Sequence, residues 1–461
     1  MENQRGPVFE GIVDESASTP TPERHRIAAL DYLRGFALLG ILVLNIGGFS
    51  GPHSLHDIPI GTVKPAFVGW HAHLDMTILM IEWIFFEAKM RGLFSILFGA
   101  GCVLLTERLE RKNLPAADIF LRRNMWLALF GLLHGTLIWD GDILLSYALC
   151  ALLFLYPLRH VASRTLIGTG FAIWLIGGTW GVAQLLDAPA AIHAEALHEQ
   201  AVADQAAAHI LSQAEIDSLV KWNQARKEAA SAPSEAARLH TQPYLEGLQR
   251  RANRYLDYVI AYFRSGVFLA IVGCMMTGMG LYKAGFLSGG LSSRTYFRVA
   301  LSGYAICLPV VIFGLWQASR SGFSRGETMK WVFLPYTLEQ AAGTIADTAL
   351  LLLLFKSGLA RHIVAALKAV GRTAFSNYIL TSLICQTLFV WSSLKWYGSL
   401  EYYQEFYVVA AVWLFNMVAS SLWLRIFSYG PLEWIWRSLT YWRRPPMLSH
   451  RKISTMVATT D

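Results

Sequence analysis

The sequence predicts an all-α polytopic membrane protein, a helical bundle of about ten transmembrane helices with one broken or interfacial helix near residues 74–106. Of its 461 residues, 54% are hydrophobic and 15% are charged, whereas a soluble domain is usually about 25% charged. Long apolar runs recur from residue 32 to residue 427. They are continuous rather than alternating, which favours membrane helices over barrel strands. The net charge of +7 lies mainly in short segments between the runs, as a topology signal requires, so no nucleic-acid partner is expected.

The apolar runs predict ten crossings. In chain order we expect them near residues 32–49, 92–105, 124–139, 143–158, 166–186, 258–282, 299–318, 337–355, 374–394 and 406–427. The segments after every second crossing hold most of the Lys and Arg, with the segment 319–336 as the one exception, which predicts that both termini are cytoplasmic. Residues 1–23 contain no apolar signal segment, so we expect the first crossing to direct the chain to the membrane.

Residues 74–106 form the least regular apolar segment. These roughly 33 residues are too many for one straight crossing and too few for two, because one crossing needs about 20 residues. Glu87, Lys89 and Arg91 lie just before Gly92. We therefore expect a helix break near residues 90–92. The three charged residues form either a buried, substrate-binding network beside a cavity or a solvated group at the membrane interface.

The crossings and the polar segments divide the chain into five parts. We expect a polar cytoplasmic tail (1–26), an N-terminal membrane half (27–186), an extracytoplasmic Ala-rich helical segment (187–254), a C-terminal membrane half (255–442) and a cytoplasmic tail (443–461).

The principal candidate site lies in FGLLHGTLIWDGDILLSY, residues 130–147. His134 is inside an apolar run, where an ionisable group is costly and often functional. It is a candidate general base, and the alternative is a histidine that hydrogen-bonds a neighbouring helix. Asp140 is the second candidate catalytic residue. Asp142 either binds substrate or caps the next helix. We expect His134, Asp140 and the charged residues 87–91 to border one polar cavity.

Other polar residues give weaker signals. Asn377 lies in an apolar run and either contacts substrate or joins two helices by a hydrogen bond. His71 and His73 follow His53 and His56 in one loop, but their spacing does not match a metal site. The five cysteines all lie in apolar runs without a CxxC pair, which indicates buried residues rather than a disulfide framework. No metal and no resident cofactor are expected.

Several segments resemble the YeiB family of bacterial inner-membrane proteins. The matching segments are LDYLRGFALLGILVLN (30–45), EAKMRGLFSILFGAG (87–101), FGLLHGTLIWDGDILLSYAL (130–149), GRTAFSNYILTSLIC (371–385) and GPLEWIWRSLTY (430–441). That family resembles, more distantly, the transmembrane acyltransferase superfamily. Superfamily enzymes use a histidine near the outer end of the loop after the first crossing, which makes His71 and His73 alternative catalytic residues.

The resemblance implies two functions. The first is transfer of an acyl group from cytoplasmic acyl-CoA, as co-substrate, to a small-molecule or glycan acceptor outside the cytoplasm. The second is a transporter or permeation pathway for a small polar or anionic solute, in which the same residues would be substrate or proton sites. The resemblance also implies the bacterial inner membrane as location, with the lipid bilayer as partner. The residues do not decide the oligomeric state, nor whether the chain is an enzyme.

Overall fold

The computed structural model describes residues 28–51, 67, 69–177, 180–230, 238–239 and 244–448. Within these ranges the chain is helical and has no strand; the one β contact is an isolated bridge between Phe427 and Leu448. This confirms the predicted all-α class. The N-terminal tail, residues 449–461, His53 and His56 lie outside the described residues.

The first half of the bundle contains α1 and the broken α3–α4 segment. Helix α1 (Ala28–Ser50) is buried along most of its length and packs against α17 (Arg361–Arg372) and α4 (Lys89–Arg111). Helix α3 (Ala72–Phe85) precedes α4, and the break falls at residues 86–88, where Ala88 has φ +63°. The predicted break is confirmed, about four residues earlier than expected.

Gly92 is not the break but a helical packing position. A Cβ atom there would lie 2.3 Å from the Thr344 Oγ1 atom, so the glycine allows α4 to approach α16 (Tyr336–Ser357) closely.

The central hairpin presents the candidate site. Helix α5 (Ala116–Leu133) continues into the π-helical turn η3 (His134–Ile138). After a short turn, α6 (Leu144–Cys150), η4 (Ala151–Leu155) and α7 (Tyr156–Leu158) return antiparallel to α5. Helix α8 (Ser163–Gly177) then packs against α13 (Phe268–Lys283).

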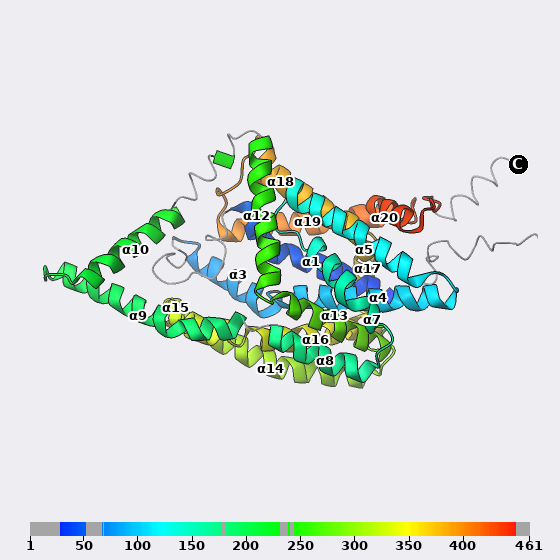
Figure 1. Cartoon of the computed structure of the whole chain (residues 1–461), viewed down its shortest axis with the longest axis horizontal. Coiled ribbons are helices and arrows are strands. Elements are labelled where there is room, and N and C mark those ends of the chain that lie inside the picture. Colours follow the sequence, from blue (N-terminus) through cyan, green and yellow to red (C-terminus); the bar gives the residue numbers. More distant parts are fainter. Residues whose placement is uncertain are drawn as a thin grey trace, which may run out of the picture.

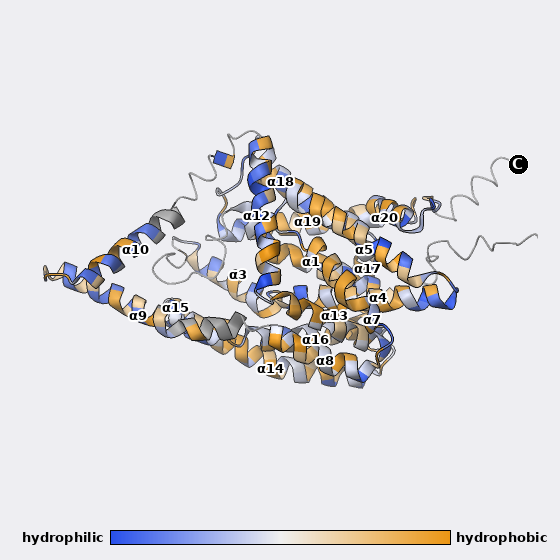
Figure 2. Cartoon of the chain, viewed as in Figure 1, coloured by the Kyte–Doolittle hydropathy of each residue, from blue (hydrophilic) through white to orange (hydrophobic). Residues whose placement is uncertain are grey.

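Three long helices follow α8 and precede α13. An arm that projects from the bundle is formed by α9 (Trp180–Ala206) and α10 (Gln213–Ala230). Helix α12 (Tyr244–Arg264) then passes across the bundle (Figure 1). The expected single crossing 258–282 is wrong as a straight helix, because α12 and α13 meet at 71°. Gly266, with φ +77°, lies at that bend. Figure 2 shows more hydrophilic positions in the arm and α12 than in the central helices.

The C-terminal half completes the bundle. The remaining elements are α14 (Ser293–Arg320), α15 (Arg325–Thr328), η5 (Met329–Phe333), α16, α17, α18 (Ala374–Gln386), η6 (Thr387–Trp391), α19 (Tyr402–Trp423) and α20 (Pro431–Tyr441). Within the described ranges, six helices are long and apolar enough to cross a membrane, or seven if the bent α12–α13 pair is one crossing. The polytopic architecture is thus confirmed. The full count of ten stays a prediction, because α5–η3, α6–α7 and α8 fall outside those six.

Candidate functional site

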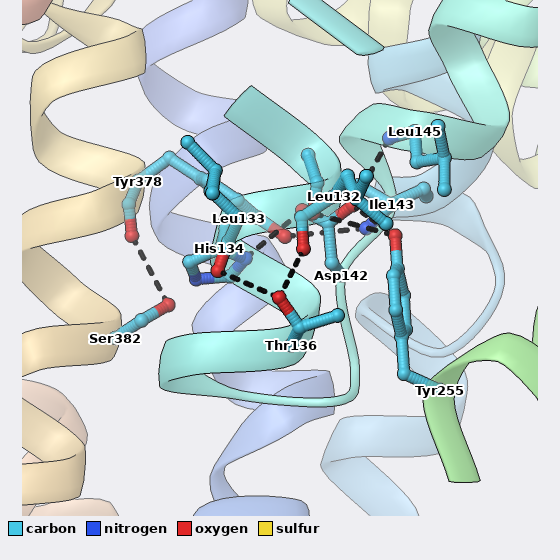
Figure 3. A network of polar contacts seen from close by, with 11 residues as sticks. Leu132, Leu133, His134, Thr136, Asp142, Ile143, Leu145, Tyr255, Tyr378 and Ser382 are labelled. Atoms are coloured by element: carbon cyan, nitrogen blue, oxygen red, sulfur yellow. Dashed lines mark hydrogen bonds and ion pairs between the residues drawn. The ribbon is translucent and has the colours of Figure 1, made fainter. Parts of the chain in front are cut away.

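A buried histidine–aspartate pair lies at the tip of the α5–α6 hairpin. The Nδ1 atom of His134 is 2.9 Å from the Oδ1 atom of Asp142, and each residue is 2% exposed. The local backbone explains the approach. His134 opens the π-turn η3, and Trp139 leaves it in an extended conformation (φ −153°) that turns the chain back toward the histidine. The polar contacts around the pair are drawn in Figure 3.

Asp142 is held by two further donors. Its Oδ2 atom accepts hydrogen bonds from the Tyr255 hydroxyl (2.9 Å) and from the Leu145 backbone N–H (3.0 Å). Tyr255 reaches this position from α12, and it contacts Gly135, where a Cβ atom would lie 2.3 Å from the tyrosine ring. Gly135 is therefore required for the tyrosine to reach the carboxylate.

The pair has the arrangement of a general base with its orienting carboxylate. An ionised carboxylate only accepts hydrogen bonds, so its contact with Nδ1 places the proton there and leaves the lone pair on Nε2. The Nε2 atom is buried and has no hydrogen-bond partner among the described residues. The Tyr378 ring packs against the imidazole, with 5.1 Å between ring centroids. The free lone pair can therefore take a proton from a molecule that reaches this point.

Asp140 does not pair with His134. Its Oδ2 atom lies 3.3 Å from the Arg254 guanidinium, whose side chain is 60% exposed. The sequence favoured Asp140 as the functional carboxylate and Asp142 as the cap. The structure instead gives Asp142 both the contact with His134 and the capping contact with Leu145.

The charged residues before Gly92 form a second cluster. The Arg91 guanidinium bonds Glu87, and Tyr336 donates to Glu87 at 2.6 Å. Lys89 is 1% exposed, and its amine donates to the backbone oxygens of Trp83 (2.9 Å) and Glu87 (3.2 Å). These carbonyl groups flank the α3–α4 break, so the lysine stabilises it.

The alternative candidates have separate environments. His71 contacts the buried Asp75, with 2.6 Å between Nδ1 and Oδ2, and this second pair lies at the start of α3. His73 is exposed. Asn377 donates to Thr373 Oγ1 (3.0 Å) and Ser420 Oγ (2.8 Å), which confirms the hydrogen bond between α18 and α19. Among the described residues no three His, Cys, Asp or Glu side chains converge to hold a metal.

A cavity of about 240 Å³ opens beside the pair. One end is rich in half-buried arginines, and most of the other lining residues are apolar, although Asp31, Asn124 and Glu433 also line the cavity and Asp31 pairs with Arg34 at 3.1 Å. The arginines are Arg34, Arg108, Arg123, Arg372 and Arg437. The opposite end is lined by Leu144, Tyr147 and Tyr378, and Tyr378 also contacts the His134 ring. The cavity is not lined by any of the residues that were expected to share one polar cavity, namely His134, Asp140, Glu87, Lys89 and Arg91. The prediction that they border one cavity is therefore wrong for this cavity.

The residues that complete the site carry almost no local sequence signal. Tyr255 is 113 positions from Asp142, and the cavity arginines come from five helices. Each of those arginines is indistinguishable in sequence from a topology signal. The only sequence sign for Tyr255 is the strong amphipathic pattern of α12, which predicts a buried face but not a partner.

The fold and site define a polytopic α-helical membrane protein with a buried histidine–aspartate pair. The family described as "Protein of unknown function (DUF418)" matches residues 281–443. The chain is similar to "Uncharacterized protein YxaH" of Bacillus subtilis (strain 168), with 28% identity over 95% of this chain and 100% of YxaH. It is similar to "Uncharacterized protein YeiB" of Escherichia coli (strain K12), with 29% identity over 92% of this chain and 98% of YeiB. The two relatives align with this chain over nearly their whole length, so the chain is similar to the YeiB-type proteins from end to end. No solved structure matches it significantly.

Proposed function

We propose that this protein is a membrane acyltransferase that passes an acyl group from cytoplasmic acyl-CoA to a hydroxyl or amine acceptor at the outer side of the bacterial inner membrane. The observation that carries the proposal is the cavity that joins the arginine-rich end to Tyr378, beside His134. Arginine binds phosphate groups by paired, charge-assisted hydrogen bonds. A donor with phosphates at one end and an acyl thioester at the other suits such a cavity.

The orientation follows from the charge pattern. The cavity arginines lie in the first halves of α1 and α5, in the last turns of α4 and α17, and in α20. The topology expected from Lys and Arg puts these positions on the cytoplasmic side, which holds CoA. The His134–Asp142 pair would then lie toward the outer side, where an extracytoplasmic acceptor enters.

The proposed reaction is a direct acyl transfer. The acceptor O–H or N–H gives its proton to His134 Nε2 while its oxygen or nitrogen bonds the thioester carbonyl carbon. The tetrahedral intermediate collapses, the C–S bond breaks, and the CoA sulfur takes the proton from the imidazolium. Asp142 keeps the Nδ1 proton in place and stabilises the imidazolium charge, which is the usual role of such a carboxylate. Tyr378, at the cavity end, would contact the thioester.

The test uses the purified protein in liposomes with acetyl-CoA as donor and a panel of amine and hydroxyl acceptors, with release of the free CoA thiol as readout. His134→Gln keeps hydrogen bonding but cannot titrate, so turnover should fall by about 10²–10⁴-fold, the usual contribution of a general base. Thermal unfolding checks that the variant is folded. Full turnover in His134→Gln would remove it as the base, and the His71–Asp75 pair would be the next candidate.

A second variant pair tests the donor cavity. The Arg123 guanidinium lies over the Trp436 ring at 3.7 Å in the cavity, and the Arg320 guanidinium lies over Trp316 at 4.9 Å outside it. Arg123→Gln should weaken CoA binding by about tenfold or more, because a hydrogen bond to a charged group contributes about 1.5–3 kcal/mol. Arg320→Gln should leave binding unchanged. No CoA binding to the wild-type protein, together with flux of a solute through it, would favour the transporter function.

A further inference from the structure

A second group of buried ionisable residues lies between helices α4, α14 and α16, apart from the His134 site. Lys89 begins α4, and Glu339 and Asp347 belong to α16. Lys89 and Glu339 are 1% exposed and Asp347 is 8% exposed. Both helices belong to candidate membrane spans. Lys89 was a candidate from the sequence, whereas Glu339 and Asp347 were not.

Gly343 lies between Glu339 and Asp347 on α16 and makes room for Lys89. It lies four residues after Glu339 and four before Asp347, so all three positions share one face of α16. A Cβ atom on Gly343 would lie 2.9 Å from the Lys89 Cε atom and 3.0 Å from the Cys307 Sγ atom. The lysine side chain therefore lies against α16 at Gly343, a position midway along the helix between the two residues that carry the carboxyl groups.

The two carboxyl groups are only partly satisfied. Asp347 Oδ1 accepts a hydrogen bond from the Tyr304 hydroxyl at 2.7 Å. Asp347 Oδ2 and Glu339 Oε1 are buried without a hydrogen-bond partner among the described residues. The Lys89 amine makes its two hydrogen bonds to the backbone oxygens of Trp83 and Glu87. In the described part of the chain it forms no ion pair with either carboxyl group.

The charges of Lys89, Glu339 and Asp347 do not balance when all three groups are ionised. Glu87 and Arg91 neutralise each other. The remaining groups facing the site are Tyr336 from α16 itself, Tyr304 and Cys307 from α14, and the neutral Gln340–Trp174 pair, which joins α16 to α8. With Lys89 charged and both acids ionised, the site carries one net negative charge. Such a charge is costly at membrane depth, and one proton removes it.

A proton fits this site better than a metal cation. Metal cations of biological sites take several converging oxygen ligands, whereas eight residues along α16 separate the carboxyl-bearing Cα atoms by about 12 Å at 1.5 Å per residue. Among the described residues no group of three His, Cys, Asp or Glu side chains is placed to hold a metal.

We propose that Glu339, Lys89 and Asp347 form an intramembrane proton site that holds one exchangeable proton on its two carboxyl groups. The proton adds to a carboxylate oxygen when it arrives from water and leaves to water by the reverse step, while Lys89 remains an ammonium. This gives the protein a protonatable element within the bilayer, independent of the acyl transfer proposed for the His134 site.

Infrared spectroscopy of the full-length protein in liposomes tests the proposal. At neutral pH the wild type should show the carbonyl stretch of a buried protonated carboxylic acid, and this band should shift to lower frequency after transfer to D2O. Asp347→Asn and Glu339→Gln should each remove or displace the band. The control Asp217→Asn changes an exposed carboxylate on α10 that bonds Gln213, and should leave the band unchanged.

Three results would overturn the proposal. Absence of the band in the folded wild-type protein would mean that no carboxyl group holds a proton at neutral pH. A band unchanged by both substitutions would belong to other residues, and a band that never shifts in D2O would come from a proton that does not exchange. Because the first and third results come from the wild type, the test stands even if a variant fails to fold.

Discussion

Substitution of Asp142 by asparagine should separate the catalytic role of this residue from its structural role. Asp142 accepts three hydrogen bonds, from His134 Nδ1, the Tyr255 hydroxyl and the Leu145 N–H. An amide offers one oxygen acceptor and an NH2 donor. If the oxygen keeps Tyr255 and Leu145, the NH2 faces His134 and converts Nδ1 to an acceptor. The histidine proton then moves to Nε2, and the base is lost while the three contacts remain.

The magnitudes follow from these contacts. Asp142→Asn should lower turnover by about 10²–10⁴-fold and cost at most about one hydrogen bond, ~1 kcal/mol. Asp142→Ala leaves three donors without an acceptor, and each buried unsatisfied donor costs about 1–3 kcal/mol. Asp140→Asn removes only the ion pair with the exposed Arg254, so it should change stability by about 0–1 kcal/mol and leave turnover near wild type.

The assay is CoA-thiol release in liposomes, with thermal unfolding followed by tryptophan fluorescence. The two asparagine variants differ by two positions in the same turn, so each is the control for the other. Equal turnover in Asp142→Asn and wild type, or equal loss in both asparagine variants, would refute the assignment of Asp142 as the orienting carboxylate.

Two further predictions concern packing and pH. Gly343→Ala should destabilise the protein by about 1–3 kcal/mol, as overpacking does, because its Cβ atom would meet Lys89; Gly168→Ala, where a Cβ atom has open space, should not destabilise it in the same unfolding measurement. The hydrogen bond from His209 lowers the pKa of Asp204 on the arm. The stabilisation of the folded arm by this contact is present above the usual Asp pKa and is lost as pH falls through the lowered pKa. The protection of backbone amides at the end of α9 against hydrogen exchange should therefore decrease in acid. Asp204→Asn should remove this pH dependence of the protection.

The sequence predicted the architecture because membrane helices can be recognised from continuous apolar segments. It also placed the break in residues 74–106 to within a few positions. The error there is physical. Gly92 was assigned to the break, but that glycine makes room for Thr344 inside a continuous helix, and the break falls at residues 86–88. Composition cannot separate a glycine that ends a helix from one that permits close packing.

The candidate site could be predicted only in part. His134 was found because an ionisable residue in an apolar run is conspicuous. The choice between Asp140 and Asp142 depends on the turn after η3, where Trp139 is extended, and two carboxylates two residues apart give no sequence signal for that geometry. Tyr255 contacts Asp142 across 113 positions of the chain, and the local sequence around either residue gives no sign of that contact.

The most direct test of the proposed enzyme is a structure of the purified protein with a bound non-hydrolysable acetyl-CoA analogue. The proposal predicts density with its phosphates among the cavity arginines and its acyl end at Tyr378, within hydrogen-bonding reach of His134. Density for the analogue elsewhere, or none at saturating concentration, would contradict the proposal that this cavity delivers an acyl donor to the His134–Asp142 pair.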